Sequence, residues 1–271
     1  ITSLGDLLFY DTNGERTAIV KPYLVSLADD SEPNIRIAVA HLTSSCLRYA
    51  RSTAYDAFEC LIQTEDLVLA SDKFINLMIR IGTANPERVT PIINRMLTSN
   101  NPEVKNVGGS LAAYAAIQWE QPDYMELALA GDNNVRAGIV SVCNDLLNGA
   151  KNRKVLFTTL RTLMHDGDTR IRKEIGEIPS RLRKQSLSQF KDFLKYLIES
   201  PSYIYAVRHL LLALREAPDR VDDLIDLAVH RFLNIDRGDI AIGQANTFVG
   251  SSYVSELVVQ GLAQSRDKKR T

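Results

Sequence analysis

Gly131-Asp132-Asn133-Asn134-Val135-Arg136 is a polar turn that leads directly into an apolar-patterned segment, residues 137–147. From the end of the turn onward, apolar residues recur at i, i+4, i+7 and i+11, which is the spacing of one helical face. These residues are Val135, Ile139, Val142 and Leu146. The stretch therefore predicts a turn followed by an amphipathic helix, and the same pattern recurs along the chain.

The recurrence has a regular period. The first apolar residues of the corresponding helices are Ile35, Phe74, Val104, Val135, Ile171, Ile204 and Ile240. Successive members are 30 to 39 residues apart, about 34 on average, which lies within the range of stacked structural repeats. Another helical pattern precedes each member, and no segment reads as strands joined by hairpin turns. We therefore expect an all-α fold of about seven helix pairs, in which stacking buries the single apolar face of each pair.

We expect one repeat domain over residues 15–265, preceded by a lead-in segment, residues 1–14, and followed by a charged tail, residues 266–271. Residues 243–252 interrupt the helical pattern near the end of this domain. Irregular terminal repeats are typical of stacked-repeat proteins, so we interpret this break as structural.

The first helix of the series is expected over residues 15–27, with Ile19, Tyr23 and Leu27 on its inward face. In the fifth pair, Pro179 falls inside the second helix. Proline lacks the backbone donor that a helix interior requires, so we expect this helix to be kinked or shortened there.

Composition and charge are those of an ordinary folded protein. The net charge of −1 gives the whole chain no bias toward nucleic acid or acidic membranes. Cys46, Cys60 and Cys143 are odd in number and far apart, which favours reduced thiols and a cytoplasmic location over disulfides or a zinc site. No apolar run approaches the length of a membrane span. The sequence starts without a methionine or a signal-peptide pattern, and we interpret the chain as a fragment of a longer protein.

An acid in the turn and an apolar–basic pair after it recur in several repeats. The members are Asp29 and Asp30 with Ile35-Arg36, Asn101-Pro102-Glu103-Val104-Lys105, Asp132 with Val135-Arg136, and Asp168 with Ile171-Arg172. This pattern resembles HEAT repeats over about residues 15–235, although the helices that begin at Phe74 and Ile204 lack the basic residue. The resemblance implies a right-handed α-α superhelix, a HEAT-like solenoid. It also implies that a set of turn residues ties adjacent repeats together: Asp132, Arg136, Asp168, Arg172 and Arg36.

A narrower resemblance rests on Leu8-Phe9-Tyr10-Asp11, residues 67–77 and Ser255-Glu256-Leu257-Val258-Val259. These segments look like the C-terminal helical-repeat region of large bacterial STAND-type ATPases. The resemblance implies a region that senses a ligand, often in phage defence. The phosphate-binding pattern GxxxxGK[ST] is absent, so the ATPase part is expected upstream of Ile1.

Residues that commonly carry catalysis or bind metals are scattered along the chain. The four histidines belong to different repeats and form no HExxH or Cys/His cluster. They are His41, His165, His209 and His230. Asp222 and Asp223 are adjacent on a predicted helix, so their side chains point apart by about 100° and are poorly placed for paired-carboxylate catalysis. We therefore expect no enzyme activity, no metal and no cofactor.

The clearest charge asymmetry lies in residues 151–195, where twelve Lys and Arg and five Asp and Glu give a local charge of +7. Such a strip either binds phosphates or acidic protein surfaces, or is a solvated face held by ion pairs between repeats. The second interpretation is favoured, because the aromatic residues Phe157, Phe190 and Phe193 fall on core-facing positions and form no stacking platform. The binding candidates are Arg170, Lys173, Arg181, Arg183 and Lys184, with Arg181-Leu182-Arg183-Lys184 expected in a loop.

Together these features favour a non-catalytic scaffold or ligand-sensing region that binds a protein partner through side chains of the second helices. The alternative is a nucleic-acid-binding solenoid that resembles the HEAT-like alkylpurine DNA glycosylases and uses the basic face of residues 151–195. A glycosylase needs an acid and an aromatic clamp near one pocket. Trp119-Glu120 is the only candidate for this pair, and it lies two repeats away from the centre of the basic strip.

Overall fold

The computed structural model describes residues 2–234 and Ser255, and these residues form helices and turns without any β-strand. The expected all-α class is therefore confirmed. Within the same residues no helix is both long and apolar enough to cross a membrane. Several predicted features lie outside the described residues: the last helix of the series at Ile240, the break at 243–252, the motif that follows Ser255 and the tail 266–271.

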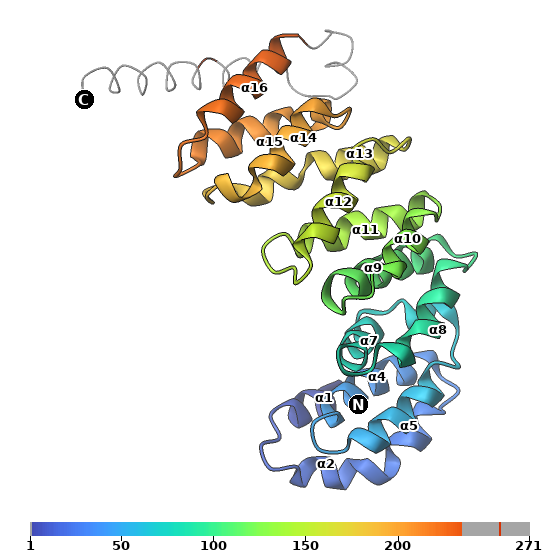
Figure 1. Ribbon diagram of the computed structural model, residues 1–271. Helices are drawn as coiled ribbons and strands as arrows, with labels where there is room; N and C mark the ends of the chain where they lie inside the picture. The colour runs from blue at the N-terminus through green and yellow to red at the C-terminus, as the bar shows by residue number, and fades with distance from the viewer. Residues whose placement is uncertain (1, 235–254, 256–271) are drawn as a thin grey trace. The chain divides into compact units, whose positions relative to one another are not determined.

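The chain forms two compact units, which are Ile1–Val142 with Ala150–Asn152 and Cys143–Gly149 with Arg153–Thr271. In unit 1, helices that are close in sequence pack on one another (Figure 1). Its elements are α1 (Thr2–Phe9), α2 (Glu15–Val20), the 3-10 helix η1 (Lys21–Tyr23), α3 (Leu24–Ala28), α4 (Pro33–Cys46), α5 (Arg51–Leu61), α6 (Asp66–Leu69), α7 (Asp72–Ala84), α8 (Pro86–Leu97), α9 (Pro102–Gln118), α10 (Asp123–Leu129) and most of α11 (Asn133–Asp145). Helix α4 contacts α1, α3, α5 and α7, and helix α9 contacts α6, α7, α8 and α10.

The first predicted helix differs from the structure in its boundaries and in its buried face. It is divided at η1, where Pro22 lies, and Ile19 and Tyr23 are 71% and 63% exposed. The buried residues are Thr17, Val20, Leu24 and Ala28. Asp11 explains the difference, because its buried carboxylate accepts the Thr17 hydroxyl (2.7 Å) and the Thr17 backbone N–H (2.9 Å). These bonds turn Thr17 inward and leave the Ile19 face outward, so the predicted inward face was wrong.

Helices α9 and α11 cross at close range because glycines face one another's backbone. A Cβ on Gly109 would lie 2.0 Å from the Val135 carbonyl oxygen, and a Cβ on Gly138 would lie 1.9 Å from the Asn106 carbonyl oxygen. Only a residue without a Cβ permits such an approach. Ser110 Oγ, 3.1 Å from the Gly138 carbonyl oxygen, adds a hydrogen bond at the crossing.

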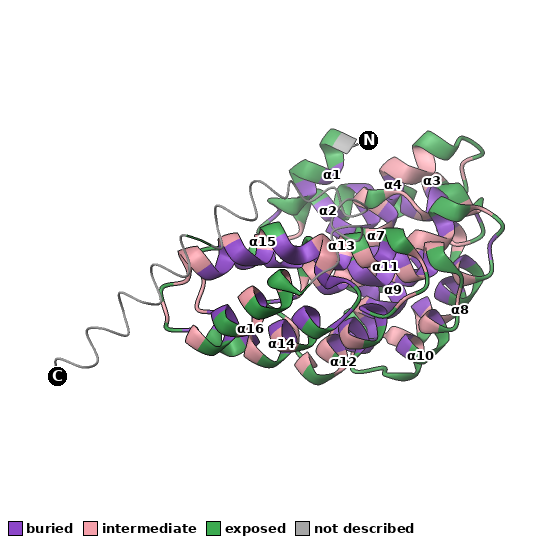
Figure 2. Cartoon of the chain, turned by 90° about the horizontal axis from the view of Figure 1, so that it is seen from above, coloured by how far each residue is buried: buried purple, intermediate pink, exposed green. Residues whose placement is uncertain are grey.

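Helix α11, into which the opening stretch leads, is buried on more than the predicted face. Figure 2 colours the chain by burial and labels this helix. Val135 and Ile139 of that face are buried, while Val142 and Leu146 are only half-buried. The additional buried residues are Ala137, Val140, Cys143 and Leu147. The buried surface of this segment is therefore wider than a single 3.6-residue stripe.

Unit 2 repeats the pairwise packing. Its elements are α12 (Arg153–Leu163), α13 (Thr169–Gly176), the 3-10 helices η2 (Ile178–Leu182) and η3 (Ser188–Phe190), α14 (Lys191–Glu199), α15 (Tyr203–Glu216) and α16 (Asp222–Leu233). Helix α14 contacts α12 and α16, while α15 contacts α13 and η2. The expected effect of Pro179 is confirmed, because α13 ends at Gly176 and Pro179 lies in the first turn of η2.

Candidate functional site

Asp132 connects the predicted third and fourth helix pairs. Its carboxylate accepts the backbone N–H groups of Asn134 (2.9 Å) and Val135 (3.2 Å) at the start of α11, and Lys105 Nζ on α9 lies 2.7 Å away. The hydrogen bond from Lys105 is the largest contribution and lowers the pKa of Asp132. Burial acts in the opposite direction, and the two backbone donors add smaller lowering contributions. Asp132 thus stabilises the start of one helix and binds the previous pair.

Two of the predicted arginines bond to the turns that precede them. Arg36 Nε donates to the Asp30 carbonyl oxygen and Arg136 Nη1 donates to the Gly131 carbonyl oxygen, each at 2.5 Å. The basic residue of the apolar–basic pair therefore closes its own turn in both repeats.

The fifth pair has a related arrangement. Asp168 accepts the backbone N–H of Arg170 at 2.7 Å and so caps α13, as Asp132 does for α11. Arg172 Nη2 donates to the Thr169 hydroxyl at 3.3 Å. These contacts also lie within one turn.

Arg95 on α8 is a connection that the sequence interpretation missed. Its guanidinium lies 2.7 Å from Asp66 and donates to the carbonyl oxygens of Ile62 (2.9 Å) and Thr64 (2.6 Å), all belonging to the previous pair. Arg95 does not follow the apolar residue that begins a second helix, so the apolar–basic pattern could not identify it.

The predicted binding residues of unit 2 are largely engaged within the unit. Arg170 pairs with Glu174 at 3.3 Å, Arg181 pairs with Asp145 at 2.9 Å, and Arg183 forms two bonds to Glu216 at 2.9 and 2.8 Å. The two lysines differ, because Lys173 Nζ lies 5.9 Å from the ring centroid of Tyr205 and Lys184 is exposed with a φ of 60°. The guanidinium groups that looked most available in the sequence are thus held by carboxylates.

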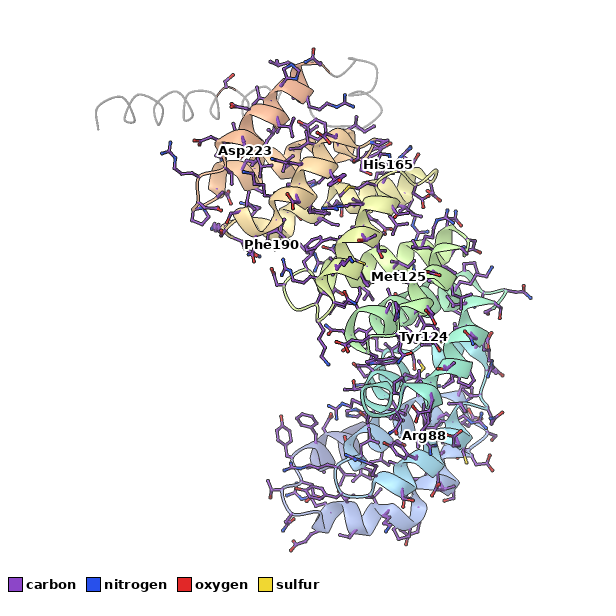
Figure 3. The ribbon with its side chains drawn as sticks, in the orientation of Figure 1. Arg88, Tyr124, Met125, His165, Phe190 and Asp223 are labelled. Atoms are coloured by element: carbon purple, nitrogen blue, oxygen red, sulfur yellow. The ribbon has the colours of Figure 1, made fainter. Side chains whose placement is uncertain are left out.

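A hollow of about 380 Å³ lies on the surface of α12 and the η3–α14 segment. Figure 3 labels Phe190, one of its lining residues. Its lining residues are Arg153, Phe157, Arg161, Ser188, Gln189, Phe190, Lys191, Asp192 and Phe193. The three residues from α12 are spaced at i, i+4 and i+8, so they follow one face of that helix. The other wall comes from residues about 30 positions later in the chain.

Three phenylalanines form the apolar part of this hollow. The ring centroid of Phe157 lies 6.2 Å from that of Phe190 and 5.6 Å from that of Phe193. Phe190 and Phe193 are 1% and 2% exposed, so the expectation that they face the core is confirmed, whereas Phe157 is half-buried. The hollow therefore has an apolar floor but offers no broad ring face to a base.

Two guanidinium groups rest on aromatic rings at the hollow. The Cζ of Arg153 lies 5.3 Å from the ring centroid of Phe157 and 5.6 Å from that of Phe190, and the Cζ of Arg161 lies 4.0 Å from the ring centroid of Tyr196. Among the described residues neither arginine has a carboxylate partner, and the buried Nε of Arg161 has no hydrogen-bond acceptor. Helix α12 itself contains no Asp or Glu. Among the described residues, Arg153 and Arg161 are thus arginines of the basic strip that contact aromatic rings in place of carboxylates.

The opposite wall carries charges of both signs. Lys191 and Lys195 lie 2.8 and 3.2 Å from the same carboxylate, Asp223 on α16, and the hydrogen bond from Lys191 is the largest contribution that lowers the pKa of Asp223. Asp192 adds a second carboxylate at the hollow itself. The α12 side of the hollow therefore carries positive charge, and the α14 side carries both positive and negative charges.

Asp219 fixes the loop that forms this wall. Its carboxylate accepts the backbone N–H groups of Leu187 (2.9 Å) and Ser188 (2.7 Å) and the hydroxyl of Ser186 (2.8 Å). Burial alone would raise the pKa of Asp219, but these donors outweigh it and lower the pKa to about 2. Ser188 and the residues that follow it line the hollow, so Asp219 positions the wall without touching the hollow.

The histidines and cysteines lie apart, as the sequence indicates. His41 Nε2 on α4 is 2.8 Å from Asp6 on α1, whereas His209 on α15 is half-buried, and burial lowers its pKa. Burial raises the pKa of the Cys46 thiol to about 11. In residues 2–234 and at Ser255, no three His, Cys, Asp or Glu side chains are grouped so that they would hold a metal ion.

Trp119, the candidate aromatic clamp of the glycosylase alternative, packs inside unit 1. A Cβ on Gly82 of α7 would lie only 2.1 Å from the Trp119 ring, and the ring is also in edge contact with Tyr114 at 5.8 Å. Glu120 follows with a φ of 58° and an exposed side chain. The indole thus fills the gap between α7 and the end of α9.

Comparison of the chain with protein-family models and with curated proteins finds no match.

Proposed function

We propose that this chain is a non-catalytic binding scaffold of HEAT-like helix pairs that holds a protein partner through side chains spread over its helices. The observation that carries the proposal is the contact between equivalent helices of successive pairs. Within unit 1, α4 contacts α7 and α7 contacts α9, and within unit 2, α12 contacts α14 and α14 contacts α16. Stacked pairs of this kind supply an extended surface on which a partner can be bound.

The solenoid part of the proposal is tested by small-angle X-ray scattering. A compact protein of 271 residues has a radius of gyration of roughly 18 Å. Stacked helix pairs give an elongated particle, so we expect a clearly larger value and an asymmetric distance distribution. A value near 18 Å would exclude an extended solenoid.

The binding part is tested by affinity capture with the full chain, followed by cross-linking mass spectrometry. We expect one retained protein to cross-link to lysines on the helix surfaces, including the exposed Lys154 on α12, the helix that forms one side of the hollow. Reversing the charge of surface residues in α12 and α14 should reduce capture if this side of unit 2 is used. A substrate turnover by the purified chain, abolished by a single substitution, would overturn the non-catalytic proposal.

The sensor version of the proposal follows from the resemblance to STAND-type ATPases. In that version the chain is the ligand-sensing region of a larger cytoplasmic protein, and the bound partner is the signal. The coding sequence upstream of Ile1 provides the test, because a nucleotide-binding module with GxxxxGK[ST] is expected there. An upstream region without such a module would remove this version while leaving the scaffold proposal intact.

The acid-free helix α12 favours one second candidate, nucleic-acid binding. Lys151, Arg153, Lys154 and Arg161 lie in or beside this helix, and a run of cations attracts phosphates. A titration of single- and double-stranded DNA at increasing salt separates the two functions. Binding whose logarithm falls steeply with the logarithm of salt would support nucleic acid, and no binding at low salt would exclude it.

A further inference from the structure

The hollow on α12 has the chemistry of a carboxylate site rather than of a structural ion pair. Arg170, Arg181 and Arg183 of the basic strip each reach a carboxylate, whereas Arg153 and Arg161 reach aromatic rings. A cation–π contact uses the charge of a guanidinium and does not consume its N–H donors, which stay available for another partner. The buried Nε of Arg161, which has no acceptor among the described residues, shows that its donors are not satisfied within this part of the chain.

The spacing of the two arginines sets the size of the ligand. Arg153 and Arg161 are eight residues apart on α12, which corresponds to about 12 Å along a helix axis. In an extended peptide, side chains four residues apart are separated by about 13 Å. The volume of about 380 Å³ is ample for side chains of a peptide and larger than one carboxylate requires.

The walls favour an acidic peptide over a nucleic acid. Phe190 and Phe193 are buried under the floor, so neither ring offers a face on which a base could stack. Asp192 lines the same hollow and would repel a continuous row of phosphates, whereas a peptide can place an amide or hydroxyl group there. Ser188 and Gln189 provide neutral hydrogen-bonding groups on that side.

We propose that the α12 hollow binds an extended acidic segment of a partner protein, in which two carboxylates four residues apart are held by Arg153 and Arg161. This inference rests on the proposed scaffold function and names the partner surface that the scaffold would bind. Phe157 between the two arginines would contact an apolar side chain of the segment, and Asp219 would hold the η3 wall in place from outside the hollow.

The test uses the full chain and fluorescein-labelled peptides of Gly and Ser that carry two Glu residues four positions apart, with fluorescence anisotropy measured at low salt. We expect binding that weakens about tenfold in Arg153→Gln and in Arg161→Gln, the ratio for one lost charge-assisted hydrogen bond. Arg181→Gln is the matched control, because it removes one arginine that is already paired elsewhere in unit 2. Its affinity should stay within about twofold of the original chain.

Arg153→Lys and Arg161→Lys keep the positive charge and replace the planar guanidinium with an ammonium group. Circular dichroism of each variant tests whether it is folded. We expect these variants to bind more weakly than the original chain, because an ammonium cannot make the paired bonds of a guanidinium. A peptide with Gln in place of both Glu residues should not bind.

Three outcomes would overturn the inference. The first is that the di-Glu peptide does not bind at low salt, which would show that there is no such site. The second is that a single-stranded oligonucleotide binds more tightly than the peptide and depends equally on Arg153 and Arg161, which would assign the site to nucleic acid. Binding that is equally reduced by Arg181→Gln places the acidic partner elsewhere on the chain. In the last case the scaffold proposal stands while this inference fails, so the two are separable.

Discussion

Asp219→Asn should loosen the η3 wall of the hollow by an amount that follows from its pKa. Three donors, from Ser186, Leu187 and Ser188, hold the carboxylate and lower its pKa from 3.8 to about 2. Because one unit of pKa shift corresponds to 1.36 kcal/mol, the charged form contributes about 2 kcal/mol to the stability of this region. The amide of asparagine is uncharged and can accept only part of these bonds, so most of this contribution should be lost at neutral pH.

The sign of the pH dependence is fixed by the direction of the shift. A carboxyl whose pKa is lower in the folded state stabilises the fold fully above its unfolded pKa, and this stabilisation is lost as the pH falls toward about 2. The difference between Asp219→Asn and the original chain should therefore be constant from pH 7 to about pH 5. It should shrink steadily below about pH 4 and approach zero only below pH 2, where the carboxyl is protonated in both the folded and the unfolded state.

Native-state hydrogen exchange is the appropriate assay, because the amides of Leu187 and Ser188 are themselves bonded to Asp219. A loss of about 2 kcal/mol corresponds to about thirtyfold faster exchange in a locally opening segment. Asp226→Asn on α16 is the matched control, since that exposed carboxylate has no hydrogen bond to a described residue. Exchange that is unchanged at pH 7, or accelerated equally by Asp226→Asn, would refute the reasoning.

Three further predictions concern stability. Gly109→Ala should destabilise unit 1 by about 2–3 kcal/mol in urea unfolding, because the added Cβ would lie 2.0 Å from a carbonyl oxygen of α11. Gly167→Ala is the control, because the space around Gly167 is open, and it should leave the free energy of unfolding nearly unchanged. Lys184→Gly should stabilise unit 2 by about 1 kcal/mol in the same assay, because a φ of 60° is strained for lysine, and a loss of stability would contradict this. Lys105→Gln should cost under about 1 kcal/mol, because the pair with Asp132 is partly exposed, and added salt should reduce the difference from the original chain.

The sequence predicted the helices better than their contacts. The apolar period located the second helices, and Pro179 marked the end of α13, because both signals are local. The face of the first helix was mispredicted because the side chain of Asp11, six residues before Thr17, determines which side turns inward. The spacing of apolar residues predicts which helix face is apolar, but it does not predict which polar residues form buried hydrogen bonds.

The hollow shows the same limit for charge. Arg181 and Arg183 looked available in the sequence, but their partners are 36 and 33 residues away, at Asp145 and Glu216. The sequence analysis did not single out Arg153, Phe157 and Arg161 as a stripe on one helix face, and the rings that their guanidinium groups contact include Phe190 in η3 and Tyr196 in α14. Which cations remain unpaired is decided by the register between helix pairs, and local spacing carries no information about that register.

The polar connections between helix pairs also bear on how the chain folds. Lys105 and Asp132 are 27 residues apart, Arg88 and Glu59 are 29 apart, and Arg183 and Glu216 are 33 apart, so each bond joins residues about one period away. Closing loops of this size costs little more entropy than closing shorter ones, and none of these bonds requires distant ends of the chain to meet. Low contact order of this kind favours rapid folding that starts in one pair and spreads to the next. If one helix pair were duplicated or deleted, each remaining ion pair would still find its partner in an adjacent helix pair.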